Sequence, residues 1–226
     1  MKKAVITGDI IQSGKLKPEE KEWLIKNIKS ALKIWNKDFQ MKSEMYRGDS
    51  FQCLLQEPVQ SMRVALIIKT FIKSLNPSEI FDMYNRKNLN IKTAKIISLN
   101  MVDTRISIGI GSVELEMKSI ATSDGVAFNI SGANLDKIKS TRQSIIIGTD
   151  DDHNAELETE IILLDNIIST ATAMQCEVIY LKLLGYTEIK IANILKIKQS
   201  AVNQRSIAAG WNAIETLIKR FETIYG

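Results

Sequence analysis

Short strand-like runs alternate with longer amphipathic stretches along the first 148 residues, and this order limits the fold more than any other feature. Runs of β-branched and other apolar residues that stop at a glycine or a turn predict strands. Pro18 and Pro58 each open a stretch with apolar residues every three or four positions, as in a helix with one buried face. The order β-α-β-β-α-(α)-β-α-β, with the bracketed helix around 87–98, predicts an α+β fold with helices on one face of a sheet, close to the ferredoxin-like βαββαβ plan. The expected strands are 2–8, 41–47, 50–56, 105–113 and 144–148, and the expected helices run from Pro18, from Pro58 to about Leu75, and over 126–139.

The chain after residue 148 differs in both pattern and charge. Residues 149–169 hold seven acidic residues and no Lys or Arg, whereas residues 1–148 carry 23 basic and 15 acidic residues. From residue 170 onward there are seven basic residues and four acidic ones. We therefore expect an α+β domain over 1–150 and an all-α domain over 151–226, joined by an acidic segment. Helical periodicity predicts helices over about 156–170, 172–184, 188–195 and 199–222.

Apolar residues at helical spacing in several segments are expected to belong to the core. This group comprises Trp23, Trp35, Trp211 and Phe221. A second stripe with a/d-like spacing either packs internally or pairs two subunits, so a homodimer is a further expectation. It consists of Leu157, Ile161, Leu164 and Ile168.

Composition excludes several classes of protein. The chain is 45% hydrophobic and 25% charged, as in soluble globular proteins, and no apolar run is long enough to cross a bilayer. The N-terminal apolar run is too short for a signal peptide, so a cytoplasmic location is expected. Cys53 and Cys176 lie among apolar residues and are expected to be buried free thiols. The single histidine, His153, lies in an acidic stretch, which excludes a Ser-His-Asp triad or a His-rich metal site.

Two Gly-Asp pairs, Gly8-Asp9 and Gly48-Asp49, stand where strand-like runs stop or turn. The first and third strands of a βαββαβ sheet are neighbours, so Asp9 and Asp49 are expected at the same edge. Two carboxylates there would suit a hard divalent cation, Mg²⁺ or Mn²⁺. The alternative is that both acids cap turns. Ser13 and Gly14 could add backbone donors for a phosphate beside them, although a plain polar loop explains both residues equally well.

Four segments of the first domain resemble class III nucleotidyl cyclases. TGDIIQS and YRGDSFQCLL resemble the two metal-binding segments, RISIGIGSV resembles the strand that follows, and GVAFNISGANL resembles the helix with transition-state groups. The resemblance implies that Asp9 and Asp49 hold two metal ions, which activate a ribose hydroxyl and brace a triphosphate. The expected ligand-binding residues are Ser13, Arg47, Ser50 and Asn129.

Two positions depart from the cyclase pattern. Ala133 stands where the family has an arginine, and Met45 stands where it has a base-selecting lysine. Loss of an arginine that stabilises developing phosphate charge argues against efficient cyclisation. Arg47 and Arg105 are candidate substitutes. The site is therefore expected to bind a ligand more readily than to turn it over.

Residues 185–214 have the layout of a helix-turn-helix. Thr187 caps the first helix, Ala192 allows close helix crossing, and Val202 anchors the second helix. Lys196 occupies a turn position that often holds Gly, and Lys198 stands where an N-cap Ser or Thr is expected. A helical dimerisation module is the alternative. The candidate DNA-contacting residues are Lys198, Gln199, Ser200, Asn203, Gln204 and Arg205.

Over nearly its full length the chain resembles the SatD family, through ITGDIIQS, YRGDSFQCLL, RISIGIG, SDGVAFNISGANLD and the QSAVNQR helix. This resemblance implies a cyclase-like domain followed by a helix-turn-helix, without an established reaction. The leading hypothesis is a transcription regulator that binds DNA and senses a nucleotide or metal–phosphate ligand. The rival is a metal-dependent nucleotidyl cyclase or transferase whose helical tail mediates assembly. A protein–protein adaptor is a third possibility.

Overall fold

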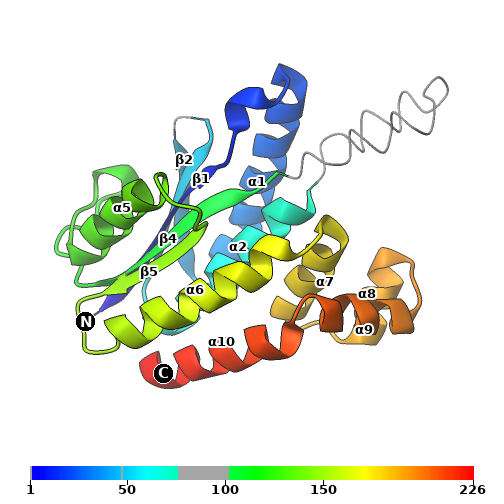
Figure 1. The fold of residues 1–226 in the computed structure, drawn as a ribbon. Coiled ribbons are helices and arrows are strands. Elements are labelled where there is room, and N and C mark those ends of the chain that lie inside the picture. Colours follow the sequence, from blue (N-terminus) through cyan, green and yellow to red (C-terminus); the bar gives the residue numbers. More distant parts are fainter. Residues whose placement is uncertain (1, 47, 76–101) are drawn as a thin grey trace.

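A five-stranded mixed sheet forms the centre of the computed structural model, which describes residues 2–46, 48–75 and 102–226 (Figure 1). The sheet order is β2-β3-β1-β4-β5, in which β1 pairs antiparallel with β3 and with β4, while β4 pairs parallel with β5. This is the βαββαβ plan with one strand added, and the predicted α+β class is confirmed. The strands are β1 (Lys3–Ile10), β2 (Met41–Tyr46), β3 (Ser50–Leu55), β4 (Thr104–Gly111) and β5 (Ile145–Thr149).

Helices cover both faces of this sheet, so the expectation of helices on one face is wrong. The first helix begins at Pro18 as predicted, whereas Pro58 opens a short 3₁₀ helix (Pro58–Gln60) that leads into α2. The helix expected around 87–98 lies outside the described residues. The helices are α1 (Pro18–Asp38), α2 (Ser61–Ser74), α5 (Val126–Ile138), α6 (Asn154–Thr170), α7 (Ala173–Leu183), α8 (Glu188–Leu195), α9 (Gln199–Ala208) and α10 (Trp211–Tyr225).

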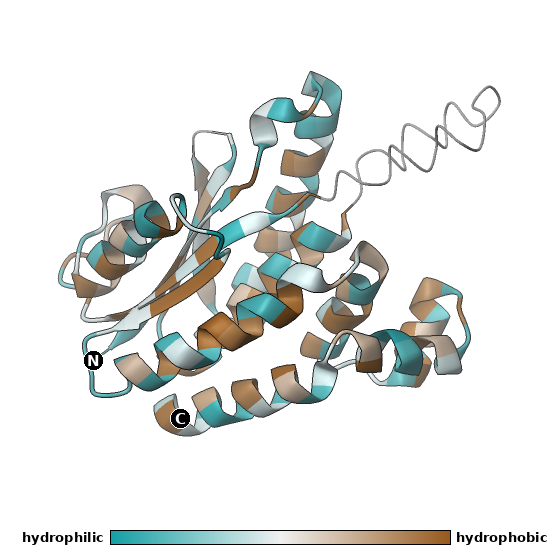
Figure 2. Cartoon of the chain, in the orientation of Figure 1, coloured by the Kyte–Doolittle hydropathy of each residue, from teal (hydrophilic) through white to brown (hydrophobic). Residues whose placement is uncertain are grey.

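Alternation along β1 explains the two layers. Ala4 and Ile6 face one side, where they pack with α1, α2, α6, α7 and α10 in the main core cluster. Val5 faces the other side and packs with Ala127 and Phe128 of α5. In Figure 2, β5 is largely brown, which marks hydrophobic residues, whereas the other strands also carry pale and teal stretches. Each strand therefore contributes one set of side chains to each layer.

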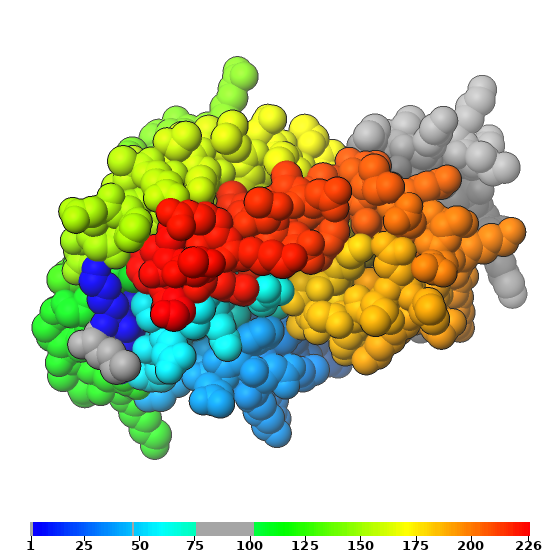
Figure 3. Space-filling view, turned by 90° about the horizontal axis from the view of Figure 1, so that it is seen from below, coloured from blue at the N-terminus to red at the C-terminus, as the bar shows by residue number. Residues whose placement is uncertain are grey.

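The main core crosses the expected domain boundary at residue 150. Leu157, Ile161, Leu164 and Ile168 of α6 are at most 1% exposed and pack internally, which removes them as a subunit interface. Figure 3 shows α10 along the surface between α6 and the N-terminal half of the chain. The α8–α9 pair instead contributes to a smaller cluster of its own.

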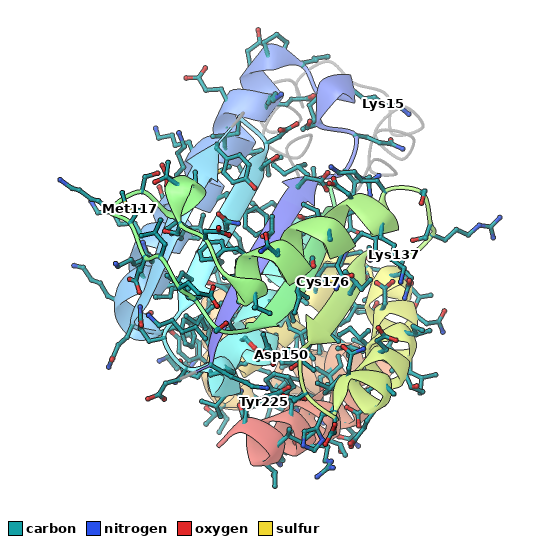
Figure 4. All side chains as sticks on the ribbon, turned by 90° about the vertical axis from the view of Figure 1, so that its left-hand side faces the viewer. Lys15, Met117, Lys137, Asp150, Cys176 and Tyr225 are labelled. Atoms are coloured by element: carbon teal, nitrogen blue, oxygen red, sulfur yellow. The ribbon has the colours of Figure 1, made fainter. Side chains whose placement is uncertain are left out.

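Contacts at one end of the sheet fasten the two halves of the chain. Lys2 pairs with Asp150 at 2.6 Å and with Asp151 at 3.0 Å, and the Tyr225 hydroxyl donates to Asp151 at 3.1 Å. Figure 4 shows Asp150 and Tyr225 near each other at this end, and Lys15 at the opposite end. The first strand and the last helix are thus tied to the same acidic segment.

A helix expected over 199–222 is two helices. Gly210 has φ +73°, a left-handed backbone conformation that glycine adopts without strain, and it separates α9 from α10. Glycine inside a helical pattern is tolerated often enough that the periodicity alone does not predict the break.

The smaller expectations about side chains have mixed outcomes. Trp35 and Phe221 are buried in the core, whereas Trp23 and Trp211 are only partly buried at its margin. Cys53 and Cys176 are free and buried, as expected. Burial raises the pKa of Cys53 to about 12 and that of Cys176 to about 11. No helix within the described ranges has the length and apolar character to cross a membrane.

Candidate functional site

The central strand β1 brings the two Gly-Asp pairs to one edge of the sheet. Asp9 lies opposite Ser50 on β3 and Arg105 on β4 in the two ladders. Asp49 immediately precedes β3, and its carbonyl accepts a 3.0 Å hydrogen bond from the backbone N–H of Ile10. The two acids are therefore on neighbouring chain segments, at the edge where the βαββαβ plan predicts them.

Both glycines have structural reasons to be glycine. A Cβ atom at Gly8 would lie 2.3 Å from the ring of Phe51 and 2.8 Å from the carbonyl oxygen of Arg105. Gly48 lies in the hairpin turn and has φ +78°, a backbone conformation that glycine adopts with less strain than other residues. The Gly-Asp pairs thus combine a backbone requirement with a polar side chain at a strand end.

Asp9 has a cationic partner from the chain itself. Its carboxylate lies 3.3 Å from Nη1 of Arg105, and the two side chains are 18% and 25% exposed. Its backbone carbonyl accepts a 2.6 Å hydrogen bond from Oγ1 of Thr104. A cation from solvent must therefore compete with Arg105 for this carboxylate.

Asp49 has a different partner. Its Oδ2 accepts a 2.5 Å hydrogen bond from Oγ of Ser13, which is buried in a short 3₁₀ helix (Ser13–Lys15). The preceding residue, Gln12, has φ 56°, so the chain turns sharply after β1. This bond closes the loop after β1 onto the hairpin, which is the turn-capping role that the sequence also allows.

The other residues expected to bind a ligand do not all lie beside Asp9. Ser50 is half-buried beside Asp9, and Asn129 is exposed on α5. Arg47 lies outside the described residues. Met45 packs against the main core, on the face of the sheet opposite to α5, and Ala133 is exposed on α5. Neither of the last two positions offers a charge toward Asp9.

The acidic residues at this edge are too few, among the described residues, to form a metal centre from protein ligands alone. Within the described part of the chain, no three Asp, Glu, His or Cys residues are grouped to hold a metal ion. Asp9 and Asp49 would supply two carboxylates. Mg²⁺ is commonly held by one or two carboxylates, with water and substrate phosphates completing its shell. The residues therefore suit a metal–phosphate complex better than a permanent all-protein metal centre.

A row of polar side chains extends from Asp9 beneath α5, and the sequence did not lead us to expect it. Gln52 donates a 3.2 Å hydrogen bond to Oγ1 of Thr7, which lies 3.0 Å from Oγ of Ser131. Ser107 is fully buried opposite Thr7, and its Oγ has no hydrogen-bond partner among the described residues. The sequence does carry a signal for this row, because polar residues stand at alternate positions of each central strand.

The C-terminal segment contains two short helices joined by a tight turn. Oγ1 of Thr187 accepts a 3.3 Å hydrogen bond from the backbone N–H of Lys190, which caps α8. The turn residue Lys196 has φ 53°, the left-handed conformation expected at a position that often holds Gly. Ile191 and Val202 are fully buried between the helices.

One side of α9 is polar and exposed. Arg205 is half-buried, and one of its Nη atoms lies 3.5 Å from the sulfur of Met174. The side-chain amide of Asn203 makes a weak 3.5 Å contact with Glu188, which also pairs with Lys182 at 3.0 Å. The exposed members of the predicted set are Lys198, Gln199, Ser200, Asn203 and Gln204.

Comparisons with known proteins give structural similarities only. No protein-family model matches the chain, and no curated protein matches it. A bacterial light-regulated adenylyl cyclase aligns with a TM-score of 0.46 and 18% identity, covering 66% of this chain and 43% of that chain. The guanylyl cyclase domain of the RhoGC fusion protein from the aquatic fungus Blastocladiella emersonii aligns with a TM-score of 0.46 and 12% identity. The alignment covers 69% of this chain and 82% of that chain. The guanylyl cyclase Cya2 aligns with a TM-score of 0.42 and 13% identity, covering 61% of this chain and 70% of that chain. The function is therefore argued from this chain's own residues.

Proposed function

We propose that the chain is a cytoplasmic regulatory protein that binds DNA through α9 and senses a nucleotide or metal–phosphate ligand at Asp9 and Asp49. The resemblance to the SatD family implies the two parts, a cyclase-like domain followed by a helix-turn-helix, and supplies no established reaction. The observation that carries the proposal is the exposed polar side of α9, set on a helix pair that is packed and capped.

Charge around α9 favours a phosphate backbone. Residues 185–208 contain four basic residues and one acidic residue, Glu188, whose carboxylate is already paired with Lys182. Gln and Asn side chains at the start of α9 can make bidentate hydrogen bonds to adenine in the major groove. Lys198 and Arg205 are within the same surface and can contact phosphates, which adds affinity without sequence preference.

Binding to random-sequence duplex DNA tests the DNA-binding part. We expect fluorescence anisotropy at low salt to detect binding, and the Lys198→Gln/Arg205→Gln variant to weaken it about tenfold. In the same variant, the logarithm of the DNA-binding constant should depend less steeply on the logarithm of the salt concentration, with a slope smaller in magnitude by about two. A matched control, Lys29→Gln/Lys219→Gln, removes the same charge from exposed sites on α1 and α10 and should leave both values unchanged. Undetectable binding by the unmodified chain, or equal weakening by both variants, would exclude this part of the proposal.

The ligand part is separate from the DNA part. Asp9 and Asp49 would hold one Mg²⁺ or Mn²⁺, the phosphates of the ligand would complete its shell, and Arg105 would turn from Asp9 toward a phosphate. We expect calorimetric titration with Mn²⁺ and ATP or GTP to show binding that Asp49→Asn weakens at least tenfold. Asp136→Asn, an exposed acid on α5, is the control and should bind normally. Equal binding by all three proteins would contradict this part alone.

An enzyme is the second candidate, because Asp9 and Asp49 occupy neighbouring strand ends, as the cyclase resemblance implies. A divalent-metal nucleotidyl cyclase or transferase would convert ATP or GTP, and Asp49→Asn would abolish product formation. Chromatography of the nucleotides after incubation with Mn²⁺ separates the two functions. Ligand binding without product favours the sensor, whereas product that depends on Asp49 favours the enzyme.

A further inference from the structure

A groove of about 630 Å³ lies where α1, α2 and α7 meet, on the side of the sheet away from α5. Five of the chain's fourteen aromatic residues line it, although aromatic residues are only 6% of the sequence. These residues are Trp35, Phe39, Phe71, Tyr180 and Tyr186. No residue of the Asp9 edge is among those that line the groove.

The rings hold one another in place. The centroids of Trp35 and Phe71 are 5.2 Å apart with the planes at 88°, and those of Phe71 and Tyr180 are 5.2 Å apart at 54°. The first pair is edge-to-face and the second is tilted, and aromatic pairs of both kinds are stabilising. The aromatic wall is therefore formed before any ligand arrives.

One charged residue, an aspartate, is among the residues that line the groove, while Lys37 and Lys182 stand in the last turns of α1 and α7. Asp38 lines it and makes no hydrogen bond or ion pair with the described part of the chain. The lining residues include no Lys or Arg, although the chain carries 30 of these residues. The last turn of α1 and the end of α7 both contribute lining residues, and helix C-termini carry partial negative charge.

The chain already stacks a cation on one of these rings. Nζ of Lys190 lies 3.7 Å from the centroid of the Tyr186 ring. An ammonium group over an aromatic face is attracted by the ring quadrupole, and the attraction strengthens with desolvation. The nearby Lys182 is committed elsewhere, because it pairs with Glu188 and lies 5.1 Å from the ring centroid of Trp211.

We propose that this groove binds a hydrophobic organic cation, of the aryl-substituted quaternary ammonium class. The apolar rings would cover the organic body of the ligand, while Asp38 and the two helix ends would face its charge. Tyr186 immediately precedes Thr187, the N-cap of α8, so an occupied groove touches the start of the α8–α9 pair. The site is independent of Asp9 and Asp49.

Calorimetric titration of the full chain with benzyltrimethylammonium tests the proposal. The uncharged isostere neopentylbenzene and the anion benzenesulfonate are the comparison ligands. We expect the cation to bind at least tenfold more tightly than the isostere, since shape and apolar area match and only the charge differs. Benzenesulfonate should not bind.

Substitutions at two lining residues, Asp38 and Tyr180, locate the binding. Asp38→Asn keeps the shape of an exposed side chain and should weaken binding of the cation about two- to fivefold, without changing that of the isostere. Tyr180→Leu should weaken it similarly, whereas Tyr180→Phe keeps the ring and should bind normally. Asp136→Asn on α5 is the control for charge. Equal affinity for the cation and its isostere, or a cation affinity unchanged by Asp38→Asn, would overturn the proposal, as would no binding of the cation.

Discussion

At the residue scale, the position of Asp9 depends on the lack of a side chain at Gly8. The Phe51 ring fills the space above Gly8 and is fully buried, so it cannot move aside. The β1–β3 register that sets Asp9 opposite Ser50 is therefore sterically fixed. The absence of a side chain at Gly8 thus fixes where a carboxylate of the candidate site lies.

We expect Gly8→Ala to lower the free energy of unfolding by about 1–3 kcal/mol, because the new methyl group overpacks the core. Urea denaturation measures this change. Gly14→Ala is the control, since nothing lies within 4 Å of a Cβ atom there, and it should change stability by less than about 0.5 kcal/mol. Equal stability of the two variants would show that β1 and β3 accommodate the methyl group without losing stability.

Three features of the candidate site illustrate what the sequence could and could not predict. The shared edge of Asp9 and Asp49 follows from strand order, which periodicity predicts. The Asp9–Arg105 pair does not follow, because it depends on the β1–β4 register between segments almost a hundred residues apart. The polar row of Thr7 and Gln52 was not expected either, since polar residues at alternate strand positions ordinarily indicate a solvent-facing side.

At the element scale, a buried charge network joins α2 to the starts of β4 and β5. Nζ of Lys69 is fully buried and donates to Asp103 at 2.7 Å, to the carbonyl of Thr104 at 2.6 Å and to Ser144 at 2.8 Å. Ser144 in turn donates to Asp165 of α6 at 2.5 Å. Burial lowers the pKa of Lys69, and the charge and hydrogen bond of Asp103 oppose that shift. The ammonium therefore needs its carboxylate partner.

We expect Lys69→Met to destabilise the chain by about 3–5 kcal/mol, because it leaves the network without its cation. The Lys69→Met/Asp103→Asn variant should recover part of this loss, since it also removes the carboxylate that has lost its closest cation and keeps, among the described residues, only Lys73 at 3.9 Å. Chemical denaturation of the two variants and of Asp103→Asn completes the cycle. Additive losses would show that the two residues do not interact energetically.

The loop after β4 is fastened across β1 and β2 by one carboxylate. Glu116 lies 2.6 Å from Nζ of Lys3 and 2.5 Å from Nζ of Lys42. Hydrogen bonds from Lys3 and Lys42 lower its pKa to about 2. Because the folded pKa is below the ordinary value of 4.5, the stabilisation is present above that value and is lost as pH falls toward about 2.

We therefore expect the stability difference between the unmodified chain and Glu116→Gln to depend on pH. It should be constant above about pH 5 and shrink as pH falls from there toward 2, because the carboxylate is then progressively protonated. Urea denaturation at a series of pH values measures the difference. The same difference at pH 3 and pH 7 would show that the two lysines contribute nothing to stability through Glu116.

At the scale of the whole molecule, the helices after residue 150 complete the core of the sheet. Nζ of Lys73 donates to the carbonyls of Ile168 and Ser169 at 2.6 and 2.7 Å, which joins α2 to the end of α6. Arg63 pairs with Glu222 of α10 at 2.7 Å. The change of charge and pattern at residue 150 predicts two domains, but periodicity cannot show which apolar faces meet. Their packing makes the stability of each part depend on the other.

Hydrogen exchange in mild denaturant tests this dependence. We expect β1, β4, α6 and α10 to lose protection together, because one hydrophobic cluster holds them. The α8–α9 pair should open at lower denaturant, since its buried residues form a smaller cluster that shares only α7 with the main core. Separate transitions for residues before and after 150 would instead support two independent folding units. Opening of α8–α9 only with the sheet would mean that the proposed DNA-contacting helix is as rigid as the core beneath it.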